Sequence, residues 1–310
     1  MKLDAIHHIT CITANGPDNA DFYVGVLGLR LVKKTVNFDV PDAYHLYYGD
    51  DLGNPGSIFT FFEYPNAARG RPGAGMIHRI SWRVQTEAAL DFWAGRLTSS
   101  GIEVDQADGA LRFSDPEGLG HELVVDASGN PPSAATAESI PTENRIIGLD
   151  GVRAYALDPG ASERLLVKTL GFTSQSGGEH SIKGDTRSAS YSLGTAPEVP
   201  GIQGAGTVHH IAWACTPQDQ VRWRELVGEA GFSVTEILDR KYFTSIYFRE
   251  PSGVLFEIAT IGPGFTVDEP AETLGEDLQL PSWHEALRAR LERTLTPIRA
   301  ANPGELRRTA

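Results

Sequence analysis

Cysteine is scarce in this sequence, and a long hydrophobic run is absent. Two cysteines among 310 residues, Cys11 and Cys215, cannot form a disulfide framework, and neither has the spacing of a zinc ligand. We expect both to be reduced core residues. No run approaches the roughly 20 apolar residues of a membrane span, and the N-terminus lacks a signal-peptide core. These absences predict a cytoplasmic protein that does not enter a membrane.

Positive charge is also in short supply. The chain has 27 lysines and arginines against 40 aspartates and glutamates, which gives a formal charge of −13. Because no basic cluster offsets this excess, the phosphates of nucleic acid and the anionic surface of a membrane would be repelled. We therefore expect neither partner. The apolar share of 41% is ordinary for a packed protein, and the length suffices for two cores.

A strand-like motif recurs four times along the chain. The motif reads IHHIT, IHRIS, GVRAY and VHHIA at residues 6–10, 77–81, 151–155 and 208–212. A helical stretch follows each copy and ends at a glycine, which is Gly28, Gly101, Gly171 or Gly231. Alternating or apolar sequence then predicts three further strands. The repeating unit is therefore β-α-β-β-β, and the fold class is α+β.

Two of the copies end in the same way. The sequence DPEG at residues 115–118 precedes Glu122, and EPSG at residues 250–253 precedes Glu257 at the same offset. The two segments agree in both the Pro-x-Gly turn and the distal glutamate. Such agreement is hard to attribute to chance, and it indicates a true repeat.

The segment 126–144, rich in proline, serine and alanine, has the composition of a linker. We therefore expect two domains of two consecutive modules each, at residues 1–130 and 145–262. Residues 263–310 have no counterpart elsewhere in the chain. They should form a separate tail.

The tail combines an acidic stretch with an amphipathic segment. A helix is predicted at residues 281–293, with Ser282 and Glu285 as its capping box. Such a helix would either support the fold or cover the functional site.

Three residues of the repeat form a candidate metal site. His8 and His210 occupy the same position in two copies, and Glu257 closes the copy that contains His210. In another copy the matching residue is Arg79, which stays protonated and cannot bind a cation. A lone strand histidine is more often structural, but the repeat relates these three residues to one another. Two imidazoles and one carboxylate leave coordination positions open, as in non-haem iron enzymes that activate dioxygen.

Each candidate histidine has a histidine neighbour. Adjacent residues of a strand point to opposite faces, so one member of each pair should point away unless a bulge intervenes. The residues alone leave open whether His8 and His210, or His7 and His209, face the metal.

The sequence resembles the vicinal oxygen chelate superfamily, which includes glyoxalases, bleomycin-resistance proteins and extradiol dioxygenases. Within it the chain looks like the ring-cleaving hydroquinone dioxygenases, over nearly its whole length. The resemblance is carried by residues 3–10, 22–38, 44–50, 208–212, 239–240, 247–251, 255–257, 264–269 and 278–281. It implies four βαβββ modules paired into two glyoxalase-like domains with open β-barrel cavities, followed by the helical tail.

The resemblance also implies the chemistry of the site. The metal would be iron(II), with manganese(II) as the alternative, and its ligands would be His8, His210 and Glu257. The substrates would be a small aromatic diol and dioxygen. Residues expected around the ligands are His7, Thr10, His209, Arg240 and Tyr247. Of these, His209 and Tyr247 are candidates for proton transfer, and Arg240 could hold a neighbouring side chain or a developing negative charge.

Two other functions fit the same scaffold. A glyoxalase-type isomerase or lyase, or an epimerase, would use zinc, nickel or cobalt with four protein ligands, and Glu63 would have to be the fourth. A bleomycin-resistance-type protein would bind a small molecule without metal, although the retained His8, His210 and Glu257 argue against it. The sequence leaves the ring substituents, the choice between iron and manganese, and assembly into a homo-oligomer open.

Overall fold

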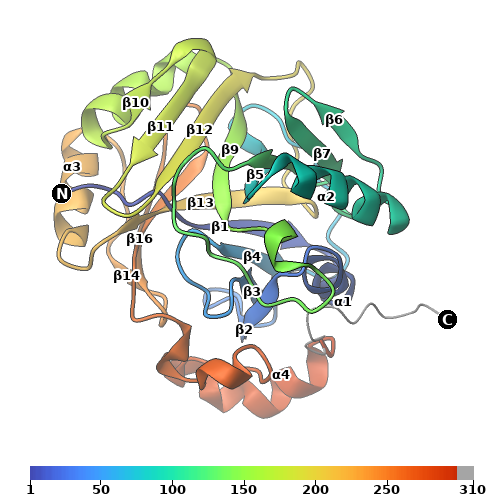
Figure 1. Ribbon diagram of the computed structural model, residues 1–310. Helices are drawn as coiled ribbons and strands as arrows, with labels where there is room; N and C mark the ends of the chain where they lie inside the picture. Colours follow the sequence, from blue (N-terminus) through green and yellow to red (C-terminus); the bar gives the residue numbers. More distant parts are fainter. Residues whose placement is uncertain (299–310) are drawn as a thin grey trace.

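Two eight-stranded sheets form the core of the computed structural model, which describes residues 1–298. The first sheet has the strand order β14 (Leu238–Asp239), β15 (Thr244–Arg249), β16 (Leu255–Thr260), β13 (Thr207–Cys215), β1 (Ile6–Thr13), β4 (Ile58–Glu63), β3 (Tyr44–Gly49) and β2 (Arg30–Val36). The second has the order β10 (Thr173–Ser174), β11 (Glu179–Lys183), β12 (Ser188–Thr195), β9 (Leu149–Ala156), β5 (Met76–Val84), β8 (Gly120–Val125), β7 (Ala110–Ser114) and β6 (Asp105–Ala107). In Figure 1 the second sheet lies above the first. The predicted architecture of four βαβββ modules in two curved sheets is confirmed.

The sheets do not join consecutive modules. At the centre of the first sheet, β1 pairs with β13 in an antiparallel ladder, so modules 1 and 4 share this sheet. In the second sheet β5 pairs with β9, which joins modules 2 and 3. We expected modules 1 and 2 to form one domain and modules 3 and 4 the other. That pairing is wrong as a description of which modules share a sheet. All four opening strands carry a similar pattern, so the sequence could not specify which of them pair. The ranges 1–130 and 145–262 stay a prediction about folding units.

One helical segment follows the first strand of each module. These segments are α1 (Gly16–Ala20) continued by a π-helix (Asp21–Val26), α2 (Glu87–Ser99), a 3-10 turn (Pro159–Ser162) continued by a π-helix (Arg164–Thr169), and α3 (Gln220–Glu229). The glycine predicted to end each helix has a left-handed backbone, with φ between +71° and +95° at the four positions. Only glycine adopts this conformation without a steric cost, which is why each helix ends there.

The tail begins with two 3-10 turns (Phe265–Val267 and Ala271–Thr273). It ends in a 3-10 helix (Ser282–Leu287) that leads into α4 (Arg288–Thr294). The predicted helix is therefore present, but its first half is tighter than an α-helix. The predicted capping box does not form, because no side chain caps this start and Glu285 instead pairs with Arg288.

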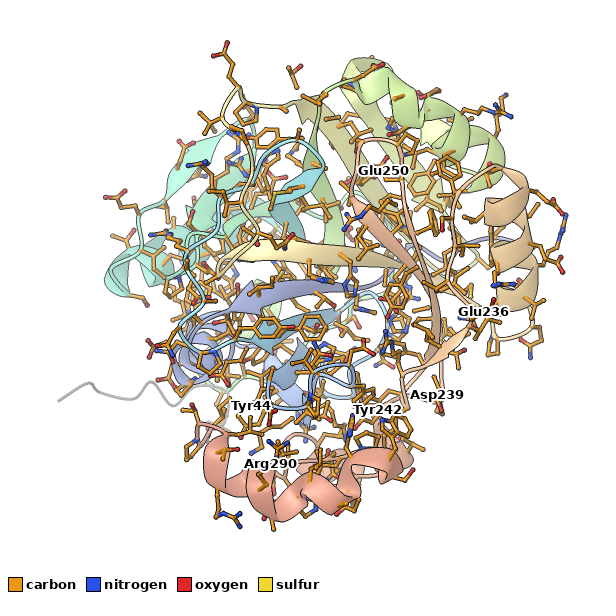
Figure 2. The ribbon with its side chains drawn as sticks, turned by 180° about the vertical axis from the view of Figure 1, so that it is seen from behind. Tyr44, Glu236, Asp239, Tyr242, Glu250 and Arg290 are labelled. Carbon is orange, nitrogen blue, oxygen red and sulfur yellow. The ribbon has the colours of Figure 1, made fainter. Side chains whose placement is uncertain are left out.

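The tail packs against one end of the first sheet. Lys33 on β2 is fully buried, and its ammonium lies 2.6 Å from a carboxylate oxygen of Asp268. The hydroxyl of Tyr242 donates to the other oxygen of Asp268 at 3.1 Å. Figure 2 shows Tyr44 and Tyr242 at the end of the sheet that faces the C-terminal helices, where Arg290 lies. Buried charge thus ties the tail to the sheet that carries the candidate site.

Within residues 1–298, no helix has both the length and the apolar character that crossing a membrane requires.

Candidate metal centre and cavity

Three buried side chains converge on the first sheet. His8 on β1, His210 on β13 and Glu257 on β16 come from neighbouring strands. The two histidine Nε2 atoms lie 3.3 Å apart. The Oε2 atom of Glu257 lies 3.3 Å from His8 Nε2 and 2.9 Å from His210 Nε2. The structure therefore brings the three predicted ligands together, as a group that can hold a metal ion.

The carboxylate of Glu257 is arranged for a cation. Its Oε1 atom accepts a hydrogen bond from Ser245, but its Oε2 atom is buried and has no hydrogen-bond partner in the part of the chain that the structure describes. An unpaired buried carboxylate oxygen is costly unless a positive group faces it. Burial acts to raise the pKa of Glu257, but His8 and His210 outweigh it and hold that pKa well below its ordinary value. A divalent ion at this point would satisfy all three donors and keep coordination positions open.

The register of the strands determines which member of each histidine pair faces the centre. The ladder between β1 and β13 shifts between Ile6 and His8, and the His7 ring lies beside the His8 ring, with 5.1 Å between ring centroids. There the Nδ1 atoms of His7 and His8 lie 2.9 Å apart, and His7 Nε2 lies 3.1 Å from the carbonyl oxygen of Thr260. His8 and His210, rather than His7 and His209, therefore present Nε2 to the centre.

A cavity of about 390 Å³ opens beside the three donors. Its walls are mostly aromatic, and it is lined by His8, Asn37, Phe38, Asp39, His45, Tyr47, Phe62, Tyr64, His209, His210, Thr235, Leu238, Arg240, Phe243, Tyr247 and Leu255. Of the residues predicted around the ligands, His209, Arg240 and Tyr247 line this cavity. His7 and Thr10 do not line it and lie buried behind its wall.

Arg240 and Tyr247 form one wall as a unit. The Nε atom of Arg240 donates to the Tyr247 hydroxyl oxygen at 3.2 Å, and its guanidinium also pairs with Asp39 at 3.1 Å. Burial and the nearby Glu257 raise the pKa of Tyr247 far above that of an ordinary phenol. The Tyr247 hydroxyl is therefore protonated, and its oxygen accepts a hydrogen bond from Arg240.

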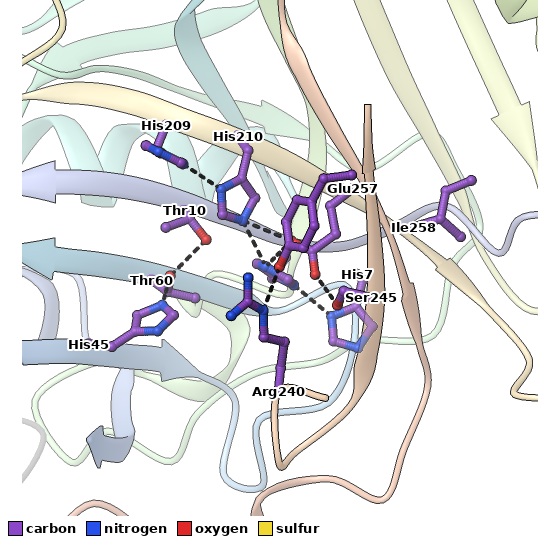
Figure 3. A network of polar contacts seen from close by, with 12 residues as sticks. His7, Thr10, His45, Thr60, His209, His210, Arg240, Ser245, Glu257 and Ile258 are labelled. Atoms are coloured by element: carbon purple, nitrogen blue, oxygen red, sulfur yellow. Dashed lines mark hydrogen bonds and ion pairs between the residues drawn. The ribbon is translucent and has the colours of Figure 1, made fainter. Parts of the chain in front are cut away.

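His45 and Tyr47, which sequence reasoning missed, also line the cavity and belong to a second chain of polar contacts. His45 on β3 contacts the Tyr47 hydroxyl at 2.9 Å and the Thr60 hydroxyl at 2.8 Å, and Thr60 donates to Thr10 at 3.0 Å. Figure 3 shows Thr10 beside His210, with Thr60 and His45 following in line below Thr10. The signal in the sequence was the alternation of YHLYY at residues 44–48, which places His45 and Tyr47 on one face of their strand.

The corresponding position of the second sheet holds arginines instead of a metal site. Glu122 is fully buried and bonds Arg153 at 2.8 Å, and Arg79 lies 3.8 Å from its other oxygen. Glu63 is not part of the group of donors at the centre, and it accepts a hydrogen bond from the backbone of Gly16 at the start of α1. The four-ligand set that an isomerase would need from Glu63 is therefore not assembled.

The fold and the site together define a class of protein: paired βαβββ modules with a two-histidine, one-carboxylate centre inside one curved sheet. The model of the Glyoxalase/Bleomycin resistance protein/Dioxygenase superfamily matches residues 5–123 and 148–258, and the chain belongs to this superfamily.

Relatives of known name cover nearly the whole chain. It is 40% identical over 307 residues to MhqO of Bacillus subtilis (strain 168), named "Putative ring-cleaving dioxygenase", with 96% of this chain and 97% of MhqO covered. It is 30% identical over 319 residues to the chlorohydroquinone/hydroquinone 1,2-dioxygenase of Sphingobium indicum, with 95% and 96% covered. A crystal structure of a Bacillus subtilis protein, described as a "putative dioxygenase", superimposes with a TM-score of 0.88 at 38% identity, over 97% of this chain and 99% of that one.

Proposed function

We propose that this protein is an iron(II)-dependent dioxygenase that cleaves the ring of a hydroquinone-type diol. The observation that carries the proposal is the convergence of His8, His210 and Glu257 at one end of an aromatic-walled cavity. The names of the full-length relatives, which are ring-cleaving dioxygenases and a hydroquinone 1,2-dioxygenase, support the reaction and the substrate class.

His8, His210 and Glu257 would hold the metal, for which iron(II) is proposed and manganese(II) is the alternative. Bound iron(II) would supply open coordination positions and the one-electron chemistry that allows dioxygen to react with an aromatic diol. The hydrogen bond from Ser245 holds the carboxylate of Glu257 in place. Fixing the ligands in this way keeps the geometry of the centre constant during turnover.

The cavity walls orient the diol and limit the access of water. Phe243 packs against the ring of His8, with 5.1 Å between ring centroids, and Phe62 packs against His209 at 5.5 Å. Fixed aromatic surfaces hold a flat ring in one plane. The bound diol therefore has little orientational entropy left to lose on the way to the transition state.

Tyr247 and His209 are proposed as proton-transfer groups. The hydroxyl oxygen of Tyr247 accepts a hydrogen bond from Arg240, so the hydroxyl proton of Tyr247 is not used in that contact and can be donated to another group. His210 offers the lone pair of Nε2 to the metal, and its proton therefore resides on Nδ1, 2.8 Å from Nδ1 of His209. His209 must accept there and carry its own proton on Nε2. It therefore offers a proton donor at the cavity.

The test is reconstitution with iron(II) under anaerobic conditions, followed by recording of oxygen uptake with hydroquinone, methylhydroquinone and catechol. Uptake with the para-diols is expected. A preference for catechol would change the substrate class, and no uptake by protein shown to hold iron would favour the isomerase. A role for His7 in orienting His8, a role for Thr10, assembly into a homo-oligomer and the cytoplasmic location stay predictions.

A further inference from the structure

We infer that Tyr47 accepts a hydrogen bond from the substrate hydroxyl that is remote from the metal, and that His45 sets this polarity. The inference rests on the proposed function, because it assigns one hydroxyl of a para-diol to the metal. A para-diol cannot chelate through both oxygens, so the far hydroxyl needs a polar partner in a cavity that is largely aromatic.

The direction of each hydrogen bond in the His45 chain can be derived. Thr60 gives its only hydroxyl proton to Thr10, so the contact between Thr60 and His45 Nε2 must be donated by His45. Burial lowers the pKa of His45 well below its ordinary value, and the ring is therefore neutral with a single proton. Nδ1 then has no proton and accepts from the hydroxyl of Tyr47. The proton of Tyr47 is thus committed, and its oxygen can only accept.

The cross-strand register places Tyr47 level with the metal centre. Thr10 is opposite His210, Thr60 is opposite Thr10, and Tyr47 is opposite Thr60, so the four residues form one row across the sheet. Tyr47 lines the same cavity as His210, Arg240 and Tyr247.

Other polar residues of the cavity have other partners or lie outside this row, and Asp39, for example, pairs with Arg240. Asn37 donates to Tyr64 and accepts from two backbone amides. Thr235 donates to the backbone carbonyl of Glu236 and accepts from the backbone amide of Tyr247. Tyr64 also lines the cavity, where its hydroxyl accepts from Asn37, but it follows the end of β4 and is not part of the row that contains His210.

An acceptor at this position selects for a donor on the substrate. A substrate hydroxyl would donate a hydrogen bond to the Tyr47 oxygen. A methyl group in the same position would leave the Tyr47 oxygen desolvated and without this hydrogen bond. The subsite therefore favours hydroquinones over phenols of the same shape, and also over quinones, which carry a carbonyl there.

The test compares anaerobic binding of hydroquinone and 4-methylphenol by calorimetry with the iron(II)-loaded protein. Wild type is expected to bind hydroquinone about tenfold more tightly, and Tyr47→Phe should bring the ratio near one. Tyr48→Phe is the matched control, because Tyr48 is the next residue on the same strand and donates to Asn19 on the opposite face. That variant should keep the wild-type ratio.

His45→Phe gives a separate readout, because it frees the proton of Tyr47. In this variant 4-methoxyphenol, whose ether oxygen only accepts, should gain affinity relative to 4-methylphenol. A merely structural role for His45 would weaken both ligands equally and would overturn the assignment of its polarity.

Three outcomes would overturn the inference. The ratio of hydroquinone affinity to 4-methylphenol affinity could be near one in wild type, it could be unchanged in Tyr47→Phe, or it could be lost in Tyr64→Phe instead. Binding requires no turnover, so a selective site without oxygen uptake would count against the proposed function while leaving the subsite intact.

Discussion

His7 on β1 and Thr260 on β16 are joined by a contact of 3.1 Å between the His7 Nε2 atom and the Thr260 carbonyl oxygen. Because a carbonyl can only accept, His7 must carry its proton on Nε2, and its Nδ1 atom then accepts from Nδ1 of His8. The proton of His8 is thereby fixed on Nδ1, and its Nε2 lone pair is directed at the centre. A backbone carbonyl of one module thus sets the tautomer of His8, a proposed ligand, in another module.

His7→Phe should therefore weaken the metal site without removing a ligand. Loss of the acceptor frees the His8 ring to rotate, and metal affinity should fall by roughly 10- to 100-fold. Competition with a chromogenic chelator measures this affinity. His78→Phe is the matched control, since His78 holds the equivalent position of the repeat in the second sheet. Equal affinities of the His7→Phe variant and wild type would refute the tautomer assignment.

Removal of any one ligand should abolish stable metal binding. His8→Ala, His210→Ala and Glu257→Ala each leave two donors, too few to compete with water for a divalent ion. Metal content per chain, measured by emission spectroscopy after gel filtration, should fall close to zero, while Glu122→Gln in the second sheet should keep the wild-type content. Full metal content in all three alanine variants would refute the assignment of the metal site.

Tyr247→Phe should keep the metal and slow turnover. The change removes the proposed proton-transfer group and leaves the ring in place, so kcat for oxygen uptake should fall by about 100-fold. Tyr44→Phe, on β3 and outside the cavity lining, should leave kcat unchanged. If Tyr247→Phe instead raises KM alone, Tyr247 only binds the substrate.

His121 should make the fold sensitive to acid. It is fully buried, accepts a hydrogen bond from Trp82 at 3.1 Å, and burial lowers its pKa to about 3. The unfolded chain has the ordinary pKa of about 6.5 and so binds the extra proton below that pH. The stability contributed by neutral His121 is therefore complete above pH 6.5 and is lost as the pH falls toward 3.

The slope for this one group is about 1.4 kcal/mol of unfolding free energy per pH unit. Urea denaturation between pH 7 and pH 5 should show it, and His121→Gln should reduce the slope by that amount. An unaltered slope in the variant would mean that His121 is not kept neutral by the fold.

Asp268→Asn should destabilise the attachment of the tail. Lys33 is fully buried, and loss of one of its carboxylate partners leaves its charge poorly compensated. The expected loss is about 3 kcal/mol, measurable by urea denaturation. Asp277→Asn, an exposed change in the same segment, should cost no more than about 0.5 kcal/mol. Equal effects of the two changes would argue against a buried ion pair.

The repeated module could be read from the sequence because its signals are local. Gly28 and its three counterparts stop each helix, and each has the left-handed backbone that this role requires. The shared Pro-x-Gly turns and distal glutamates identified equivalent closing strands. The chemistry of the ligands was also local, since His8 and His210 stand out against Arg79 at the same position of the repeat.

The pairing of the modules could not be read from the sequence. The sequence suggested consecutive partners, whereas β1 pairs with β13 and β5 with β9. Four similar opening strands offer similar hydrogen bonds to one another, and the choice depends on the packing of the whole chain. This choice places His8 beside His210 and Glu257.

The sequence by itself determined the module, the ends of its helices and the residues capable of binding a metal, because each follows from the preferences of a few neighbouring residues. Only the tertiary structure decided the rest: which modules share a sheet, which histidine of each pair faces the centre, and that His45 and Tyr47 form a wall of its cavity. These depend on strand register and on hydrogen bonds between distant residues. A shift of one residue in register would reverse the faces of a strand without changing its composition.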